Sequence, residues 1–298
     1  MNSVKRKTVI LAKKIIPFSV RFFLRKINRM LKYFFVSLGK SGKNKVYCPI
    51  ANREFKTFIK LGSNLITPSN GARNRQRLVW LYLTKELNIL NRPFKILHIA
   101  PEISYFEILK HQKNIEYFPG DKMADGYSNQ KGVNKIDITA LDCESNYFDL
   151  IICNHVLEHI PDDSKAISEM FRVLKDGGKA VVTVPMDEKL EKTFEDPNII
   201  SPAERKKYFG QWDHLRRYAL DVKQRFEKEG FNTQLIRYAV HFSQQEFEKM
   251  GLSNDFIIVG EKKCNEIPPF SRNDDAHSAA PSLATLNRTC HPEWSEAK

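Results

Sequence analysis

The stretch from Phe148 to Ile160 reads FDLIICNHVLEHI and joins an apolar run to a polar segment. The run from Phe148 to Cys153 has the length of a strand and is apolar along most of it, as expected for a central strand buried on both faces. The polar segment that begins at Asn154 then falls at the carboxyl end of this strand. The stretch therefore predicts a parallel sheet covered by helices on both sides.

Alternating strand and helix patterns continue from this strand toward both ends of the chain. Upstream, the patterns predict strands at residues 95–99, 115–118 and 135–138, with a helix at 104–111. Downstream, they predict a helix at 163–174 stopped by Asp176-Gly177-Gly178, a strand at 179–184, a helix at 222–229 stopped by Gly230, and strands at 231–238 and 256–260. This order indicates an α/β fold with a doubly wound, Rossmann-like, mostly parallel sheet.

The position of a ligand site follows from this fold class. In open parallel sheets the ligand lies beyond the carboxyl ends of the strands, near the point where the strand order reverses. We therefore expect the site in the loops at residues 100–104, 120–123 and 154–160.

The charge of the chain is concentrated at one end. Of the 298 residues, 42% are hydrophobic and 28% are charged, which excludes wholesale disorder. The net charge is +13, and residues 1–45 contain 13 Lys or Arg and no Asp or Glu. The remaining 35 basic and 35 acidic residues balance, so the body of the chain is not expected to bind nucleic acid.

Residues 18–38 are predicted to form a basic amphipathic helix. Its apolar face is formed by Phe23, Ile27, Met30, Leu31, Phe34 and Leu38. Such a helix suits an anionic membrane surface, which residues 1–38 would contact. Packing on the globular domain, binding to a partner protein and organellar targeting are the alternatives. We expect a cytoplasmic protein, with peripheral membrane association as a further option.

Four regions are expected along the chain. Residues 1–45 form the basic segment and a linker, residues 46–93 a small cap, residues 94–263 the α/β domain and residues 264–298 a disordered tail. Within the cap, residues 77–87 are predicted to be helical. Arg73, Arg75 and Arg77 are expected to be solvated.

The five cysteines do not form a recognisable framework. Their number is odd, their spacing is irregular and no C-x-x-C pair occurs, so we expect reduced thiols and no metal site. Cys153 lies in the apolar run and is predicted to be a core residue.

Two motifs resemble a known family. The stretch FDLIICNHVLEHI is similar to the fourth-strand motif of class I S-adenosylmethionine-dependent methyltransferases of type 11, and MFRVLKDGGKAVVTV at residues 170–184 resembles their strand-five motif. The resemblance covers about residues 94–263 and implies methyl transfer with S-adenosyl-L-methionine as the cofactor.

The first-strand loop departs from the family pattern. The family has a glycine-rich loop where this chain has Ala100-Pro101-Glu102. A subgroup with A-P-E at this loop looks similar, and it shares the W-L-Y-L segment at residues 80–83 and the G-Q-W-D-H segment at residues 210–214. That subgroup tends to carry paired cysteines resembling a zinc ribbon, of which Cys48 alone remains here.

The resemblance implies a set of residues around the cofactor. Asp121 would accept hydrogen bonds from the ribose hydroxyls, and Glu102 would face the methionine ammonium or sulfonium. Asp137 would accept from the adenine amine, with Leu141 packed on the ring. The other residues expected in the cleft are Ala100, Asn154 and His155.

Each of these acids also fits a structural role. Asp121 suits an ordinary loop, Asp137 a turn, and Glu102 the start of a helix, where the dipole favours a negative charge. Glu158 and His159 are expected to stabilise the start of the following helix.

The segment Phe209–Tyr218 lies where the acceptor usually sits in this fold. His214 could remove a proton from an acceptor hydroxyl or amine, with Asp213 or another carboxylate orienting it. A loop anchor is the structural alternative. Arginines near Trp212 would suit an acidic or saccharide-like small molecule.

Two other functions compete with an active enzyme. The chain could be an inactive descendant that serves as a membrane-associated interaction module, which the A-P-E loop favours. A nicotinamide dehydrogenase is disfavoured because no G-x-G-x-x-G follows a predicted strand.

Overall fold

The computed structural model describes residues 18–38, 45–122 and 131–263. The predictions for residues 1–17, for the linker, for Met123 and for the tail concern residues outside these ranges. The described part contains a seven-stranded sheet with the order β12-β13-β9-β8-β5-β6-β7. Its strands are β5 (Phe94–Ile99), β6 (Ile115–Asp121), β7 (Asn134–Lys135), β8 (Phe148–Asn154), β9 (Leu174–Thr183), β12 (Phe231–Ile236) and β13 (Ile257–Lys262). Strands β5 to β9 pair in parallel, and β13 is antiparallel to both neighbours, which confirms the mostly parallel α/β fold.

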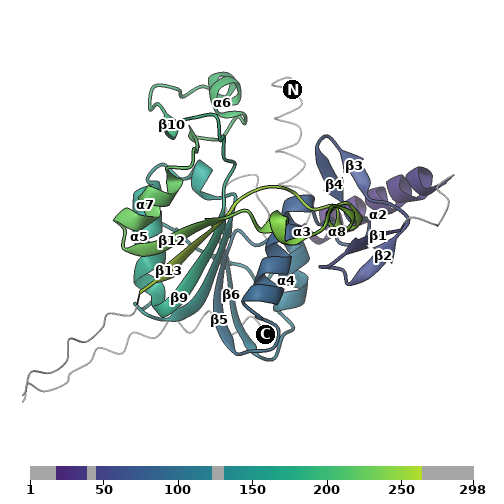
Figure 1. The fold of residues 1–298 in the computed structure, drawn as a ribbon, viewed down its shortest axis with the longest axis horizontal. Coiled ribbons are helices and arrows are strands. Elements are labelled where there is room, and N and C mark those ends of the chain that lie inside the picture. Colours follow the sequence, from purple (N-terminus) through teal and green to yellow (C-terminus); the bar gives the residue numbers. More distant parts are fainter. Residues whose placement is uncertain (1–17, 39–44, 123–130, 264–298) are drawn as a thin grey trace, which may run out of the picture.

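Helices cover both faces of this sheet (Figure 1). Helices α3 (Asn74–Leu81), continued by the π-helical turn η1 (Tyr82–Glu86), and α4 (Ile103–Leu109) lie on one face. Helices α5 (Asp163–Val173) and α7 (Val222–Lys228) lie on the other.

Successive side chains of the central strands pack alternately into two separate hydrophobic cores. Ile96 and Ile152 pack with α3 and α4, whereas Leu97 and Ile151 pack with α5 and α7. This alternation follows from the two-residue period of a strand, and it explains why the central strands are apolar along their length.

The strand order reverses between β5 and β8. Strands β5, β6 and β7 follow one another toward one edge, and the chain then returns to place β8 and β9 on the other side of β5. A crevice at the carboxyl ends of β5 and β8 is therefore the expected ligand position.

Two sequence expectations about elements were wrong. The third strand stops at Lys135, because Asp137 turns the chain by accepting from the N–H and hydroxyl of Thr139. The helix predicted over residues 163–174 is not followed by a stop at Gly177 and Gly178. Instead α5 ends at Val173 and passes directly into β9, which contains both glycines.

The cap consists of two hairpins packed beside α3. Strands β1 (Val46–Cys48) and β2 (Arg53–Phe55) form one, and β3 (Ile59–Leu61) and β4 (Asn64–Ile66) form the other. Helix α8 (Gln244–Met250) contacts β1.

The expectation that Arg77 is solvated was wrong. Its side chain is fully buried, and burial lowers its pKa to about 10. Five hydrogen bonds hold the guanidinium, with the acceptors Leu65 O, Thr67 Oγ1, Ala72 O, Met250 O and Gly251 O. The arginine therefore joins the cap, α3 and the end of α8.

An arm stands above the carboxyl ends of the strands (Figure 1). It contains β10 (Phe194–Glu195), α6 (Pro202–Phe209) and β11 (Arg216–Arg217). Ser201 and Glu204 form a capping box at the start of α6. Because β10 pairs with β11, the segment between them, which includes His214, is held over the sheet.

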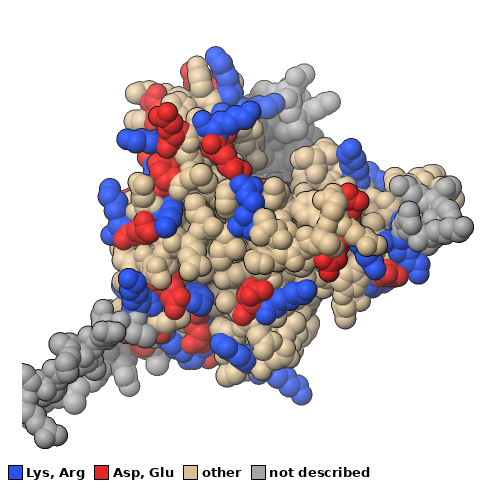
Figure 2. Space-filling view, viewed as in Figure 1, with Lys and Arg blue, Asp and Glu red and all other residues tan. Residues whose placement is uncertain are grey.

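Helix α2 (Phe18–Ser37) is attached to the cap by its polar side. Arg29 donates to the carbonyl of Ser69, and the hydroxyl of Tyr33 accepts from the N–H of Lys56. Apolar side chains on the helix remain exposed, including Phe23 at 59%, Leu31 at 54% and Phe34 at 57%. None of the helices in the described residues has the length and hydropathy needed to span a bilayer. Figure 2 shows acidic and basic side chains interspersed over the visible face of the sheet domain, as the balanced charge predicts.

Candidate functional site

The chain leaves β5 through a left-handed turn. Ala100 has φ +49°, and its N–H donates to the carbonyl of Gly120 at 2.7 Å. This conformation favours glycine, and at an alanine it costs about 1–2 kcal/mol. Pro101 and Glu102 follow, and Glu102 occupies the position just before α4.

A buried histidine in β5 holds the Glu102 carboxylate. The Nε2 of His98 lies 2.9 Å from Oε2 of Glu102, and its Nδ1 lies 2.8 Å from the hydroxyl of Tyr117. His98 is fully buried, and burial raises the pKa of Tyr117 well above its usual value. Sequence reasoning missed His98, although a polar residue inside the apolar strand KILHI marks it as unusual.

A second left-handed turn follows β8. His155 has φ +54°, and its N–H donates to the carbonyl of Thr183 at 2.7 Å. Before it, Oδ1 of Asn154 accepts from the hydroxyl of Thr183, whereas Nδ2 of Asn154 is buried and has no partner among the described residues. Left-handed backbone at non-glycine residues is costly and tends to occur at functional sites.

The turn after β8 also carries a buried acid. Glu158 is 1% exposed, and its Oε1 lies 3.2 Å from Nδ1 of His155. Burial raises the pKa of Glu158, but the hydrogen bond and charge of His155 outweigh it, and the pKa falls below the usual value. Glu158 is therefore a buried, ionised carboxylate in the turn after β8.

Arg75 carries a positive charge that interacts with the acids of both turns. It lies in α3, and its charge interacts with those of both Glu102 and Glu158. Burial, the largest cause, lowers the pKa of Arg75, and the two acids oppose that shift. Both acids therefore favour the charged form of Arg75.

Two other predicted cofactor residues, Asp121 and Asp137, lie at or just after the carboxyl ends of β6 and β7. Asp121 ends β6 and is partly exposed. Asp137 is in the turn described above, where its hydrogen bonds to Thr139 lower its pKa. Leu141 is buried beside α5, and its N–H donates to Glu169.

The arm brings His214 over the turn after β8. The N–H of Leu215 donates to the carbonyl of Glu158 at 2.8 Å, and the guanidinium of Arg216 binds the carbonyls of Leu157, Ile160 and Pro161. The Asp213 carboxylate lies 3.6 Å from Nδ1 of His159, whereas Nδ1 of His214 lies 3.3 Å from the carbonyl of Phe209. Burial lowers the pKa of His214, which keeps its imidazole neutral near pH 7.

Three of these side chains could hold a metal ion. Ligand-capable atoms of Glu158, His159 and His214 lie within 4.8 Å of one another. No local pattern in the sequence predicts this group, because His214 is 55 residues beyond His159 and comes from the arm.

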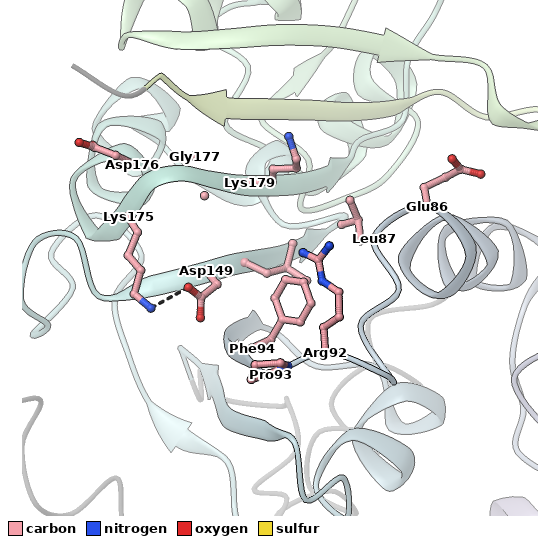
Figure 3. A pocket seen from close by; sticks show the side chains of 12 residues that line it. Glu86, Leu87, Arg92, Pro93, Phe94, Asp149, Lys175, Asp176, Gly177 and Lys179 are labelled. Atoms are coloured by element: carbon pink, nitrogen blue, oxygen red, sulfur yellow. Dashed lines mark hydrogen bonds and ion pairs between the residues drawn. The ribbon is translucent and has the colours of Figure 1, made fainter. Parts of the chain in front are cut away.

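A hollow opens at the opposite end of the sheet. It has a volume of about 340 Å³ and is lined by Arg92, Phe94, Asp149 and Lys175, among others (Figure 3). Lys175 points to Asp149 and pairs with it at 2.6 Å. This hollow lies at the amino ends of the strands, so we place the functional site at the other end, where parallel sheets bind ligands.

Comparisons with known proteins identify one family match. A family model described as a methyltransferase domain matches residues 114–182, which include β6 and β8 and most of β9. No curated protein matches the chain.

Several solved structures are similar to part of the chain. The YcgJ protein from Bacillus subtilis is 15% identical over 62% of this chain and 99% of its own, with a TM-score of 0.41. A phosphoethanolamine N-methyltransferase 2 from Haemonchus contortus, in complex with S-adenosyl-L-methionine, is 15% identical over 62% of this chain and 52% of its own, with a TM-score of 0.42. The [4+2]-cyclase SpnF is 14% identical over 80% of this chain and 93% of its own, with a TM-score of 0.40.

Proposed function

We propose that this chain, whose residues 114–182 belong to the methyltransferase domain family, transfers a methyl group from S-adenosylmethionine to a small or saccharide-like acceptor. The observation that carries the proposal is the pair of left-handed turns at Ala100 and His155. They lie on the two sides of the switch point, where the ligand crevice is expected, and Glu102 and Glu158 follow them in the sequence.

The residues in this crevice fit the chemistry of the donor. The Glu102 carboxylate at the turn would bind the methionine ammonium through one oxygen. Its other oxygen, Oε2, is held by His98. Asp121 at the end of β6 would accept from the ribose hydroxyls. The unpaired Nδ2 of Asn154 is a buried donor that a ligand oxygen would satisfy.

S-adenosylmethionine supplies a methyl group already activated by a positively charged sulfur. The residues of the chain then need to align the acceptor with that methyl and exclude water, and alignment can contribute about 7–11 kcal/mol. An acceptor hydroxyl must also lose a proton, a task for the cluster around His214 that contributes about 10²–10⁴-fold.

Calorimetry with S-adenosylmethionine tests the proposal. We expect heat of binding at high micromolar cofactor, lost in Asp121→Ala and strongly reduced in Glu102→Gln. Glu107→Gln is the matched control, because Glu107 lies on the same helix and pairs with Lys110 at the surface. An absence of heat from the folded wild type would favour the interaction module instead.

We further propose that α2 holds the enzyme at an anionic membrane surface. The polar contacts of Arg29 and Tyr33 fix the helix to the cap while its apolar residues stay exposed next to basic ones. Burial of Leu31 and Phe34 in a lipid surface would contribute about 1.5–3 kcal/mol each, and each nearby basic residue about 1 kcal/mol.

Sedimentation with vesicles tests the membrane contact. The wild type should pellet with anionic vesicles and much less with neutral ones, and Leu31→Asp combined with Phe34→Asp should abolish pelleting. Ile200→Asp combined with Val240→Asp introduces the same two charges at residues that are 70% exposed elsewhere and should have no effect. Equal pelleting of all variants would contradict the proposal.

A further inference from the structure

We propose that Glu158, His159 and His214 bind a divalent transition-metal ion, and that this ion holds the oxygen of the acceptor. The inference rests on the methyl transfer proposed above and specifies how the acceptor is activated. Two imidazoles and one carboxylate, with ligand atoms within 4.8 Å of one another, form a donor set typical of Zn²⁺ and Fe²⁺ sites. Three protein ligands leave at least one coordination position for another molecule.

The carboxylate of Glu158 points independently to a cation. Its Oε1 is paired with His155, but its Oε2 is buried and has no hydrogen-bond partner in the part of the chain that the structure describes. An unpaired buried carboxylate oxygen is costly, and native structures rarely keep one without a ligand, water or ion. A metal ion at the cluster would satisfy this atom.

Each of the two histidines has a main-chain carbonyl beside its Nδ1. The Nδ1 of His159 lies 3.2 Å from the carbonyl of Asp213, and the Nδ1 of His214 lies 3.3 Å from the carbonyl of Phe209. Because a carbonyl only accepts, each Nδ1 carries the proton and each Nε2 keeps a lone pair. Such second contacts fix the tautomer and ring direction of metal-binding histidines.

The two segments that supply the ligands are held together firmly. The bond from Leu215 to Glu158 and the three carbonyls bound by Arg216 join the arm to the turn after β8. The ligands are thus positioned by main-chain contacts rather than by the ion alone, as a preorganised site requires. This site departs from the expectation of no metal, which rested on cysteine spacing.

The ion would activate an acceptor hydroxyl. The hydroxyl oxygen would occupy the open position, where the positive charge lowers the pKa of the hydroxyl and its proton passes to solvent. An oxygen lone pair then forms the bond to the methyl carbon while the carbon–sulfur bond breaks, and the sulfur keeps that electron pair as a neutral thioether. In this reaction His214 serves as a ligand, and no free imidazole base is needed.

Titration of the chelator-treated full chain with Co²⁺, followed by its visible absorption, tests the proposal. We expect one ion per chain with the strong absorption bands of a low-coordinate site, and competition by Zn²⁺. Binding should weaken by more than about 100-fold in His159→Ala and in His214→Ala, since even supporting residues of metal sites account for 10–100-fold. His111→Ala, which removes an exposed histidine elsewhere, should bind like the wild type.

Glu158→Gln provides a further variant, and circular dichroism checks that each protein is folded. An absence of bands in the folded wild type would overturn the proposal. Undiminished binding in both ligand variants would also overturn it and would point to other histidines, such as His277 and His291. Calorimetry with S-adenosylmethionine on the same samples separates the two proposals: cobalt binding without cofactor binding contradicts only the proposed function, and the reverse contradicts only the metal site.

Discussion

Replacement of Arg77 by methionine should destabilise the protein more than any surface change. The substitution removes five hydrogen bonds and takes their donor from the main-chain carbonyls of Leu65, Met250 and Gly251, while the carbonyl of Ala72 keeps the bond from the N–H of Thr67. Each orphaned acceptor costs about 1–3 kcal/mol, but relaxation and the apolar burial of methionine offset part of this. We therefore expect a loss of about 3–5 kcal/mol in the free energy of unfolding, similar to breaking a buried ionic contact.

Urea unfolding at pH 7 measures this loss, and a thermal scan should show the midpoint falling by roughly 10 °C. Arg77→Lys keeps the charge, but an ammonium group cannot reach acceptors in the cap and at the end of α8 together. The loss in the free energy of unfolding should therefore be smaller than for Arg77→Met. Arg73→Met, at an exposed position in the same segment, is the matched control and should change stability by less than about 0.5 kcal/mol. A loss below about 1 kcal/mol for Arg77→Met would refute the role of Arg77 in joining the cap to α8.

Two further predictions concern stability. Ala100→Gly should raise the free energy of unfolding, measured by denaturant titration, by about 0.5–1 kcal/mol. Glycine relieves the left-handed strain at φ +49°, and its larger loss of chain entropy on folding offsets part of that gain. A clear loss of stability would contradict the strained turn. The hydrogen bonds that Glu169 accepts from Arg172 and from the N–H of Leu141 hold its pKa below the ordinary 4.5. Their contribution is present above that value and is lost as the pH falls through the lowered pKa, so the stability gap between wild type and Glu169→Gln should close as the pH falls below 4.5 and through the lowered pKa. A gap independent of pH would contradict the ionised state of Glu169.

The parallel core of the fold was predictable from the sequence because its strands are buried on both faces. The runs KILHI and FDLIIC can be stable only when covered on each side, and glycine at residue 230 ends α7 as expected. The short strand β7 was harder to predict, because a hydrogen-bonding turn at Asp137 competes with pairing at the edge of the sheet.

The candidate site was only partly predictable. Loop positions after β5 and β8 follow from the topology, so Glu102, Asn154 and His155 could be selected from the sequence. Arg77 could not be distinguished from Arg73, because their difference lies in carbonyls supplied by distant segments. The cluster of Glu158, His159 and His214 depends on how the arm folds back, which no local pattern encodes.

Hydrogen exchange with and without S-adenosylmethionine tests the position of the site most directly. We predict that the cofactor protects amides at residues 100–104 and 154–160, on the two sides of the switch point. Residues 86–87, 92–94 and 175–179, which line the hollow at the opposite end, should exchange as before. Protection confined to that opposite end would contradict a methyl-donor site at the carboxyl ends of β5 and β8.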